Sequence, residues 1–441
     1  MITDFKVSAF FYPYYILKYK KFLDNSEFSS KQQLVEYQNK KLQDLIKYAY
    51  QHVPYYHELL NKNKIIPSDI KTFEDLELIP PLTKDIVRER FTDLTSRIAR
   101  KFKPILTRTS GSTGTPLQFY LDKNINIAKF AIFWRVWGWT GYRLRQRWAN
   151  ICGPEFENNI IFKYLRTMNA LYISSFDMTK NNANIILKEL LKYKPTMLRG
   201  YPSAIYLFVK LVDHKEELKQ IGLKSIVTSS ETLLDFQRDF IQGSFRCNVY
   251  DNYTQWEQVC IISECEHQTK HHHMEYGIME LLNDNNEPVP SGAIGEITAT
   301  SLVNMAMPFI RYKTGDFAQK SNKACHCGRK HDVVERIDGR IEDIIVTPDG
   351  RHVGRMDAAF KYNKGFDFAQ IVQDEIEAIN VFLVANKDFD SNEQMILEKH
   401  IRDRVGNIIK INFEFKNGIK PSENGKMRFV INNYLKNKKK D

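Results

Sequence analysis

A loop of hydroxyl and glycine residues at positions 109–116 constrains this chain more than any other feature. Its sequence, TSGSTGTP, places five hydroxyl side chains and two glycines within eight residues. Glycine lets a backbone approach phosphate oxygens closely, and successive N–H groups in a turn form an anion-binding concavity. The loop is not a Walker A sequence, because Thr115 and Pro116 follow Gly114 where Lys and Ser/Thr would be needed. The composition of the loop favours a phosphate-binding site, and the positive charge of that site would have to come from elsewhere in the chain. The alternative is a surface turn without a ligand.

The length and composition predict a globular protein with two domains. A chain of 441 residues exceeds what a single hydrophobic core usually supports. Hydrophobic residues make up 43% and aromatic residues 12% of the chain, as expected for a well-filled interior rather than a disordered polymer. We expect a large N-terminal domain over residues 1–338 and a small C-terminal domain over residues 339–441.

The first part of the chain has the pattern of an α/β domain. Apolar residues at helical spacing predict a helix over residues 31–52. Pro202 opens a second helix that we expect to continue to Leu218 and to end at Gly222. Residues 224–229 (KSIVTS) then form a short buried strand that delivers residues 230 and 231 at its C-terminal end. Ligands bind at that end of the strands in open α/β sheets.

Short strands and a single helix follow in the C-terminal part. Residues 278–282 and 294–299 are expected to pair, because turn-forming sequence separates them. Beyond Arg340, strands over 344–346, 377–384 and 409–415 and a helix over 393–405 predict a compact α+β unit. The predicted fold class is therefore α/β, with a large N-terminal α/β domain and a small, mobile α+β C-terminal domain.

The charge of the chain gives no support for nucleic-acid binding. The net charge of +11 is distributed along the sequence, without a localised basic stripe or a reading motif. A basic surface that attracts anionic small molecules, or solubility alone, explains the excess equally well. Six cysteines are too few for a disulfide scaffold at this length, so we expect a reducing, cytoplasmic location.

The first residues of the sequence do not have the basic, apolar and small-residue order of a signal peptide, and no apolar stretch is long enough to span a bilayer, so we expect no membrane-spanning segment. Residues 7–17 are uncharged and aromatic, and Lys18, Lys20 and Lys21 follow them. This segment is compatible with contact to a membrane surface. Packing onto its own domain is the more common fate of such a segment, and both interpretations stay open.

Six segments in order along the chain resemble the signature elements of adenylate-forming enzymes, the superfamily of acyl- and aryl-CoA synthetases. They are the loop 109–116, the stretch 229–232 (SSET), 252–257 (NYTQWE), 310–316 (IRYKTGD), 336–343 (RIDGRIED) and 421–426 (PSENGK). The sequences at 343–350 and 426–431 resemble proteins encoded with capsular polysaccharide pathways. Thr254 departs from the usual pattern, because the family has glycine after the adenine tyrosine.

The resemblance implies a nucleotide site and the roles of its residues. The loop would hold the β- and γ-phosphates, Tyr253 would stack on adenine, Asp316 would accept hydrogen bonds from the ribose, and Glu257 would hold Mg²⁺. Lys426 would be catalytic together with Glu257, and would supply the positive charge that the loop lacks. Glu342 would be the hinge about which the small domain rotates. The residues expected to contact ATP are Thr109, Ser110, Gly111, Ser112, Thr113, Gly114, Thr115, Ser230, Glu231, Thr232, Asn252, Tyr253, Thr254, Asp316 and Arg336.

A second group of residues has the composition of a structural zinc site. Cys325 and Cys327 lie two positions apart, and Cys265 precedes a run of three histidines at 271–273. Two such pairs can supply four ligands to tetrahedral Zn²⁺, whereas unrelated thiols and solvated histidines are the alternative. Comparable cysteines recur in the phenylacetate ligase-like branch, and its spacing favours His271 over His272 and His273 as the fourth ligand.

These features together predict an AMP-forming ligase that uses ATP, Mg²⁺ and structural Zn²⁺. It would activate a carboxylic acid as an acyl-adenylate and transfer it to CoA or to another acceptor, in a role connected with polysaccharide biosynthesis. The identity of the acid and of the acceptor stays open, and a homodimer is expected by resemblance. The alternative is a nucleotide-binding scaffold that has lost turnover, which Thr254 leaves open and the intact Lys426, Glu257 and Asp316 disfavour.

Overall fold

The computed structural model describes residues 12–108, 117–152, 160–175, 178–340, 345–349, 352–353, 356–360, 365–419 and 428–438. The chain forms two compact units, and each unit combines two stretches of sequence. The first contains Met1–Leu144 and Tyr250–Ile337, and the second contains Arg145–Val249 and Asp338–Asp441. The domain limits expected above, 1–338 and 339–441, stay a prediction.

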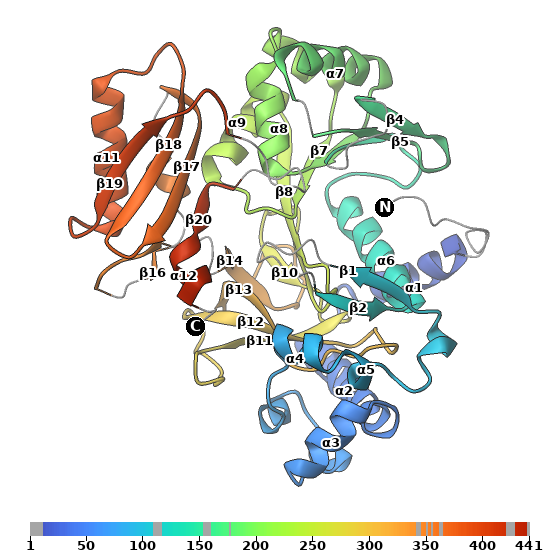
Figure 1. Cartoon of the computed structure of the whole chain (residues 1–441). Helices are drawn as coiled ribbons and strands as arrows, with labels where there is room; N and C mark the ends of the chain where they lie inside the picture. The colour runs from blue at the N-terminus through green and yellow to red at the C-terminus, as the bar shows by residue number, and fades with distance from the viewer. Residues whose placement is uncertain are drawn as a thin grey trace. The chain divides into compact units, whose positions relative to one another are not determined.

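Helices form the N-terminal part of the first unit (Figure 1). The predicted helix 31–52 is confirmed as α2, which begins at Lys31 because Ser30 caps it. The Ser30 hydroxyl accepts a hydrogen bond from the Gln33 N–H, and the Gln33 side chain accepts one from the Ser30 N–H. The helices of this unit are α1 (Tyr12–Ser26), α2 (Lys31–His52), α3 (Pro54–Lys62), α4 (Lys84–Glu89), α5 (Phe91–Leu94) and α6 (Lys123–Trp139).

Antiparallel strands complete the first unit. Strands β1 (Ile105–Arg108) and β2 (Gln118–Leu121) pair on either side of the loop 109–116. The other strands are arranged in the order β11-β12-β13-β14-β10-β9-β8. Their bounds are Asn248–Thr254 for β8, Ile261–Glu264 for β9, Lys270–His272 for β10, Gly277–Leu282 for β11, Ile294–Ser301 for β12, Tyr312–Ser321 for β13 and Val333–Arg340 for β14. The expected pairing of 278–282 with 294–299 is confirmed by the β11–β12 register.

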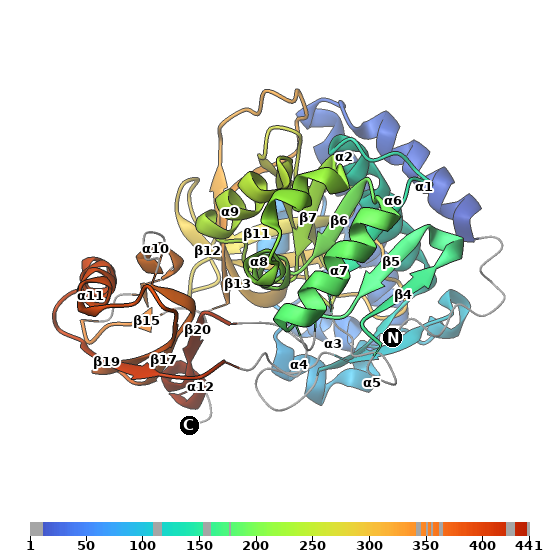
Figure 2. The same cartoon turned by 90° about the horizontal axis from the view of Figure 1, so that it is seen from above.

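The second unit contains a mostly parallel sheet. Its strands lie in the order β7-β6-β3-β5-β4, and only the β4–β5 pair is antiparallel. Helices α7, α8 and α9 supply apolar side chains to the core beside these strands (Figure 2). The bounds are β3 (Trp148–Ile151), β4 (Phe162–Leu165), β5 (Ala170–Ile173), α7 (Lys180–Tyr193), β6 (Met197–Gly200), α8 (Pro202–Leu211), β7 (Ser225–Ser229) and α9 (Asp235–Phe245).

Strand β6 ends in a close backbone contact, and the helix that follows it is shorter than expected. A Cβ added to Gly200 would lie 2.4 Å from the carbonyl oxygen of Ile151, so the end of β6 requires glycine. The prediction of one continuous helix from Pro202 to Leu218 is wrong. Helix α8 ends at Leu211, and a separate 3₁₀ helix covers Lys215–Ile221 before the left-handed Gly222. Because the apolar residues keep their helical spacing across residues 212–214, the sequence pattern does not reveal the break between the two helices.

A four-stranded α+β sheet forms the C-terminal part, with the strand order β19-β18-β17-β20. Helix α11 packs on it through Leu397, Ile401 and Val405. The predicted strands 377–384 and 409–415 and helix 393–405 are confirmed as β18, β19 and α11. The bounds are β15 (Ile345–Val346), β16 (His352–Val353), α10 (Asp357–Phe360), β17 (Phe366–Glu375), β18 (Ala378–Ala385), α11 (Ser391–Val405), β19 (Lys410–Phe415), β20 (Val430–Asn432) and α12 (Asn433–Lys438).

This architecture confirms the predicted α/β fold class with a small α+β C-terminal part. Among the described residues, no helix has both the length and the apolar character needed to cross a membrane.

Candidate functional site: a strand-end cluster and a cysteine–histidine cluster

Two strands of the first unit bring Tyr253 and Asp316 together. Tyr253 lies near the end of β8 and Asp316 lies on β13, and the tyrosine hydroxyl donates a 2.7 Å hydrogen bond to Oδ2 of Asp316. Burial, helped by the charge of Asp316, raises the pKa of Tyr253 well above its usual value. Tyr253 therefore stays a neutral phenol at all ordinary pH values and keeps its proton for the hydrogen bond to Asp316. The backbone N–H of Asp316 donates to the Thr314 hydroxyl at 3.1 Å, which fixes the turn of the chain at this point.

Glu257 and Asn252 belong to the same part of the first unit. Glu257 is 6% exposed, and its Oε1 accepts a 2.8 Å hydrogen bond from the hydroxyl of Tyr312 on β13. Asn252 is 2% exposed, and neither atom of its side-chain amide has a hydrogen-bond partner among the described residues. A buried amide without a partner is costly, so this side chain is suited to binding a polar ligand or water.

The remaining described residues of the expected ATP site lie on both units. Thr254 follows Tyr253 on β8, where it pairs with Ile261, and Arg336 is half-buried on β14. Ser230, Glu231 and Thr232 follow β7 in the second unit. Ser230 has a φ of +73°, a conformation that is uncommon outside glycine and is frequent at functional turns.

Glu231 is held at the start of a helix in the second unit. Its Oε2 accepts a 3.1 Å hydrogen bond from the backbone N–H of Ser203, in the first turn of α8. The positive end of the helix dipole favours a carboxylate there. The strand expected over residues 224–229 is β7, which pairs in parallel with β6, and Ser230 and Glu231 follow its C-terminal end as predicted.

Several expected site residues lie outside the described residues. They are the loop residues Thr109, Ser110, Gly111, Ser112, Thr113, Gly114 and Thr115, the hinge residue Glu342 and the lysine Lys426. Strands β1 and β2 bound the loop, and β20 begins at Val430, shortly after Lys426.

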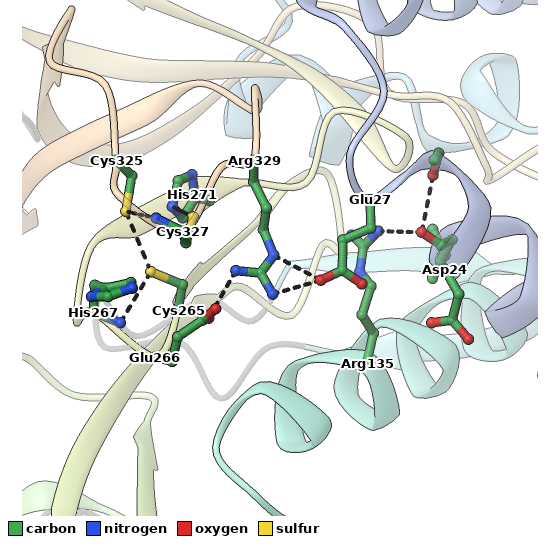
Figure 3. Close-up of polar contacts among 12 residues, drawn as sticks. Asp24, Glu27, Arg135, Cys265, Glu266, His267, His271, Cys325, Cys327 and Arg329 are labelled. Carbon is green, nitrogen blue, oxygen red and sulfur yellow. Dashed lines mark hydrogen bonds and ion pairs between the residues drawn. The ribbon is translucent and has the colours of Figure 1, made fainter.

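Three cysteines and one histidine come together in the first unit (Figure 3). Ligand atoms of Cys265, His271, Cys325 and Cys327 all lie within 4.8 Å of one another. The Cys265 and Cys325 sulfurs are 3.6 Å apart, and the Cys327 sulfur is 3.4 Å from Nε2 of His271. Ligands 2.3 Å from a tetrahedral zinc ion are separated by about 3.8 Å, so the residues present fit such an ion.

Tight turns present the sulfurs of this cysteine–histidine cluster. The backbone N–H of Cys327 points at the sulfur of Cys325 at 3.5 Å, and the N–H of His267 points at the sulfur of Cys265 at 3.4 Å. N–H groups directed at a sulfur favour its thiolate form. Burial lowers the pKa of His271 to about 4, so its imidazole is neutral near pH 7 and its lone pair can bind a metal.

The neighbouring histidines, His272 and His273, are not part of the cysteine–histidine cluster. His273 lies against Arg135, with 2.5 Å between Nδ1 and the guanidinium, and its Nε2 is 3.0 Å from the Ser263 hydroxyl. His272 is fully buried and is not part of the cluster. Of the three consecutive histidines, His271 is therefore the one whose ring nitrogen lies with the cysteines.

Sequence reasoning missed a group of charges that borders the cysteine–histidine cluster. Arg329 follows Cys327 by two positions, and its guanidinium donates to Glu27 Oε1 from Nε at 2.9 Å and from Nη2 at 2.5 Å. Nη1 of the same residue donates to Glu266 at 2.8 Å (Figure 3). A hydrogen bond from Arg329 favours the thiolate of Cys327, although burial raises the pKa of that thiol.

A second buried charge pair lies nearby in the first unit. Arg135 on α6 donates to Glu275 Oε1 at 2.8 Å, and the Ser26 hydroxyl donates to the same oxygen at 2.6 Å. His331 Nε2 is 3.0 Å from Glu275 Oε2. Burial opposes ionisation of Glu275, but the charges of Arg135 and His331 overcome it and hold its pKa well below the usual value.

Comparison with known proteins finds similar sequences over most of the chain. The description "CapK C-terminal domain" matches residues 345–433. Over 412 residues the chain is 28% identical to protein CapK of Staphylococcus aureus, covering 91% of this chain and 89% of that protein. Over 320 residues it is 25% identical to phenylacetate-coenzyme A ligase of Thermus thermophilus, covering 70% of this chain and 71% of that protein.

A solved structure shares the fold over almost the whole chain. The structure of 2-hydroxyisobutyryl-CoA ligase in the postadenylation state with 2-HIB-AMP superimposes with a TM-score of 0.77 and 19% identity, covering 95% of this chain and 94% of that one. The fold is that of an adenylate-forming CoA ligase. The sequence matches support a likeness to the phenylacetate-coenzyme A ligases and to CapK within that superfamily.

Proposed function

We propose that this protein is an ATP-dependent, AMP-forming ligase that activates a carboxylic acid as an acyl-adenylate. In the first half-reaction a carboxylate oxygen attacks the α-phosphorus of ATP and pyrophosphate leaves. In the second, an acceptor such as the thiol of CoA attacks the acyl carbonyl, and AMP leaves. The acceptor thiol loses its proton to a base or to solvent as the thioester forms, so charge and atoms balance. The relatives named as CoA ligases, and one relative named CapK, support this class of reaction and a connection with capsule synthesis.

The observation that carries the proposal is the arrangement of Asn252 and Tyr253 on β8, Glu257 in the turn after it, and Asp316 on β13, where Tyr253 and Asp316 are joined by a hydrogen bond. Asp316 offers carboxylate oxygens to the ribose hydroxyls, and the tyrosine ring next to it offers an aromatic face to the adenine. The unpartnered amide of Asn252 adds a donor and an acceptor at the same strand. These are the groups that an adenine nucleoside requires: an aromatic surface, a carboxylate and amide hydrogen-bonding atoms.

Glu257 is the proposed Mg²⁺ ligand. Mg²⁺, when bound, neutralises charge that develops on the phosphates. Tyr312 donates to one oxygen of Glu257 and so orients the carboxylate. Lys426 would donate to the reacting carboxylate and to the α-phosphate, and the residues 109–115 would donate backbone and hydroxyl hydrogens to the other phosphates. Ser230, Glu231, Thr232, Thr254 and Arg336 complete the proposed nucleotide contacts, and Glu342 is the proposed hinge.

We also propose that Cys265, His271, Cys325 and Cys327 bind one structural zinc ion. Four protein ligands leave no open coordination position, as expected for a structural rather than a catalytic site. Three thiolates and one dication leave one net negative charge, and the Arg329 guanidinium beside Cys327 is placed to compensate it. Zinc would tie the turn after β9 to strand β10 and to the connection between β13 and β14.

ATP–pyrophosphate exchange tests the proposed function, with a panel of aryl, fatty, hydroxy and amino acids. The variant Lys426→Ala should lose exchange, and the matched variant Lys387→Ala, an exposed lysine of the same C-terminal part, should keep it. Exchange with one class of acid would identify the substrate class and support the lysine. Absence of exchange with every acid, together with intact ATP binding in calorimetry, would instead support the nucleotide-binding scaffold.

A further inference from the structure

The outward face of helix α1 carries apolar and basic side chains that the proposed ligase reaction does not use. Ile16 and Leu23 point into the core and are 6% and 0% exposed, whereas Tyr14 is 63% and Leu17 is 45% exposed. Residues three, four and seven positions apart share one face of a helix. Tyr14, Leu17, Lys18 and Lys21 therefore form one exposed stripe along α1.

Helix α1 lies along α6 (Figure 2). A hollow of about 410 Å³ continues the exposed surface of α1 toward α6. Its apolar wall comes from Leu17 of α1, Trp134 of α6, and Tyr142 and Leu144 beyond α6. Lys21 and Arg143 lie at the same hollow. The surface thus combines an apolar depression with basic side chains around it.

The charges of this surface favour an anionic partner. Among the residues that the structure describes, Lys18 and Lys21 form no ion pair. The carboxylate that lines the hollow, Asp24, is already paired with Lys20 at 2.7 Å. Near the start of the helix, the Lys123 ammonium lies 4.8 Å from the ring centre of Tyr15 and adds a further positive charge.

We propose that the outward stripe of α1 (Tyr14, Leu17, Lys18 and Lys21) and the adjoining hollow dock the protein onto an anionic lipid bilayer. A bilayer surface offers both properties that this face requires, since phosphate groups lie directly above an apolar layer. Tyrosine is favoured at that boundary, and lysine extends its charged end to the phosphates while its methylene chain stays in apolar surroundings. A soluble anion would match the charges but would leave the apolar stripe exposed. The proposal is independent of the acid that the enzyme activates.

Vesicle co-sedimentation of the full-length protein tests the proposal. Vesicles of phosphatidylcholine alone are compared with vesicles that also contain phosphatidylglycerol, at low and at high ionic strength. We expect binding to the anionic vesicles that weakens with salt. The double variant Lys18→Gln/Lys21→Gln should lower the partition coefficient by roughly ten- to thirtyfold, and Leu17→Ser should lower it at both ionic strengths because it acts on the apolar contact.

The matched control is Lys188→Gln/Lys192→Gln, two exposed lysines on one face of α7, which should bind vesicles like the wild type. Thermal melting verifies that each variant is folded, and Leu17→Ser keeps the test valid if the charge variant unfolds. Equal binding to neutral and anionic vesicles, an equal loss in the α7 control, or no binding to either vesicle would each overturn the proposal. A dimer that dissociates on substitution of Leu17, without vesicle binding, would assign the surface to a second copy of the chain.

Discussion

The guanidinium carbon of Arg329 lies 4.1 Å from the ring centre of Trp139, and the same guanidinium is bound by Glu27 and Glu266. Trp139 is at the end of α6, Glu27 directly follows α1, and Arg329 belongs to the connection that carries Cys325 and Cys327. One side chain therefore joins the cysteine–histidine cluster to two helices of the first unit. Because the Arg329 side chain is only 4% exposed, its contacts are shielded from solvent.

Replacement of Arg329 by glutamine should destabilise the first unit by about 3 kcal/mol, because it leaves the mostly buried Glu27 without its cation. Urea unfolding, followed by tryptophan fluorescence, measures the change. The control is Lys323→Gln, which breaks the exposed 3.5 Å pair with Glu335 and should cost less than about 1 kcal/mol. Similar losses in the two variants would show that Arg329 does not act as a buried link.

Metal analysis should find about one zinc ion per chain after the purified protein is washed with a weak chelator. Cys327→Ser should lower the zinc content severalfold, and a strong chelator should lower the melting temperature of the wild type. Cys247→Ser is the control, since Cys247 is a half-buried cysteine of the second unit. Unchanged zinc content in Cys327→Ser, or loss in Cys247→Ser, would contradict the assignment of the four ligands.

The buried Glu275 should make stability depend on pH in the acid range. Its folded-state pKa lies well below its usual value of 4.5, so its contribution is complete above that pH and is lost as the pH falls through the folded-state pKa. Glu275→Gln should cost about 3 kcal/mol at pH 7, because Arg135 is left buried and unpaired. The difference from the wild type should narrow steadily below about pH 4.5.

Urea unfolding over a pH series measures this effect, with Glu398→Gln as the control. Glu398 forms a 2.7 Å pair with Arg402 on α11, but both side chains are about one-third exposed. Its substitution should shift stability little and evenly across the series. A gap between wild type and Glu275→Gln that stays constant to acid pH would refute the role given to Glu275.

Features that depend on residues close together in the sequence could be predicted, whereas contacts between residues far apart in the sequence could not. Local patterns carried part of the prediction: apolar residues at helical spacing indicated α2, and the spacing of Cys325 and Cys327 indicated two of the four side chains that the fold brings together. Signature segments indicated Tyr253, Glu257 and Asp316 because each lies in a short ordered stretch. The break between α8 and the following 3₁₀ helix escaped, since the apolar spacing runs through it.

Contacts between distant residues were beyond pattern analysis. Glu27 and Arg329 are 302 positions apart, and Arg135 and Glu275 are 140 positions apart. An exposed and a buried arginine look alike in a single sequence, because only the fold determines which carboxylate each one meets. Tyr312 was within reach, since it lies in the signature segment 310–316, four positions before Asp316 on the same strand. The strand signal of β17 was likewise present in the sequence and was overlooked.

Asp316→Asn should weaken ATP binding by about ten- to hundredfold, because hydrogen bonds to a charged acceptor contribute about 1.5–3 kcal/mol. Tyr253→Phe should weaken it less, since the ring that would face adenine is kept and only the 2.7 Å hydrogen bond to Asp316 is lost. Isothermal titration calorimetry measures both. Asp284→Asn, in the exposed turn after β11, is the charge-matched control. A larger effect for Tyr253→Phe than for Asp316→Asn would reverse the roles proposed for the pair.

Tyr312→Phe should raise the Mg²⁺ concentration needed for half-maximal ATP–pyrophosphate exchange by about tenfold, because groups that orient a metal ligand affect metal affinity to about that degree. Tyr312 is fully buried, and its hydroxyl donates to Glu257 at 2.8 Å. The rate at saturating Mg²⁺ should be largely kept, whereas Glu257→Gln should lose exchange at every Mg²⁺ concentration. The matched control is Tyr276→Phe, which removes another buried hydroxyl, bonded to the neighbouring Gln258 at 3.3 Å. Both tyrosine variants lose a buried hydroxyl, but only Tyr312→Phe removes a hydrogen bond to Glu257. An equal Mg²⁺ shift in the two variants, or none in Tyr312→Phe, would refute the orienting role.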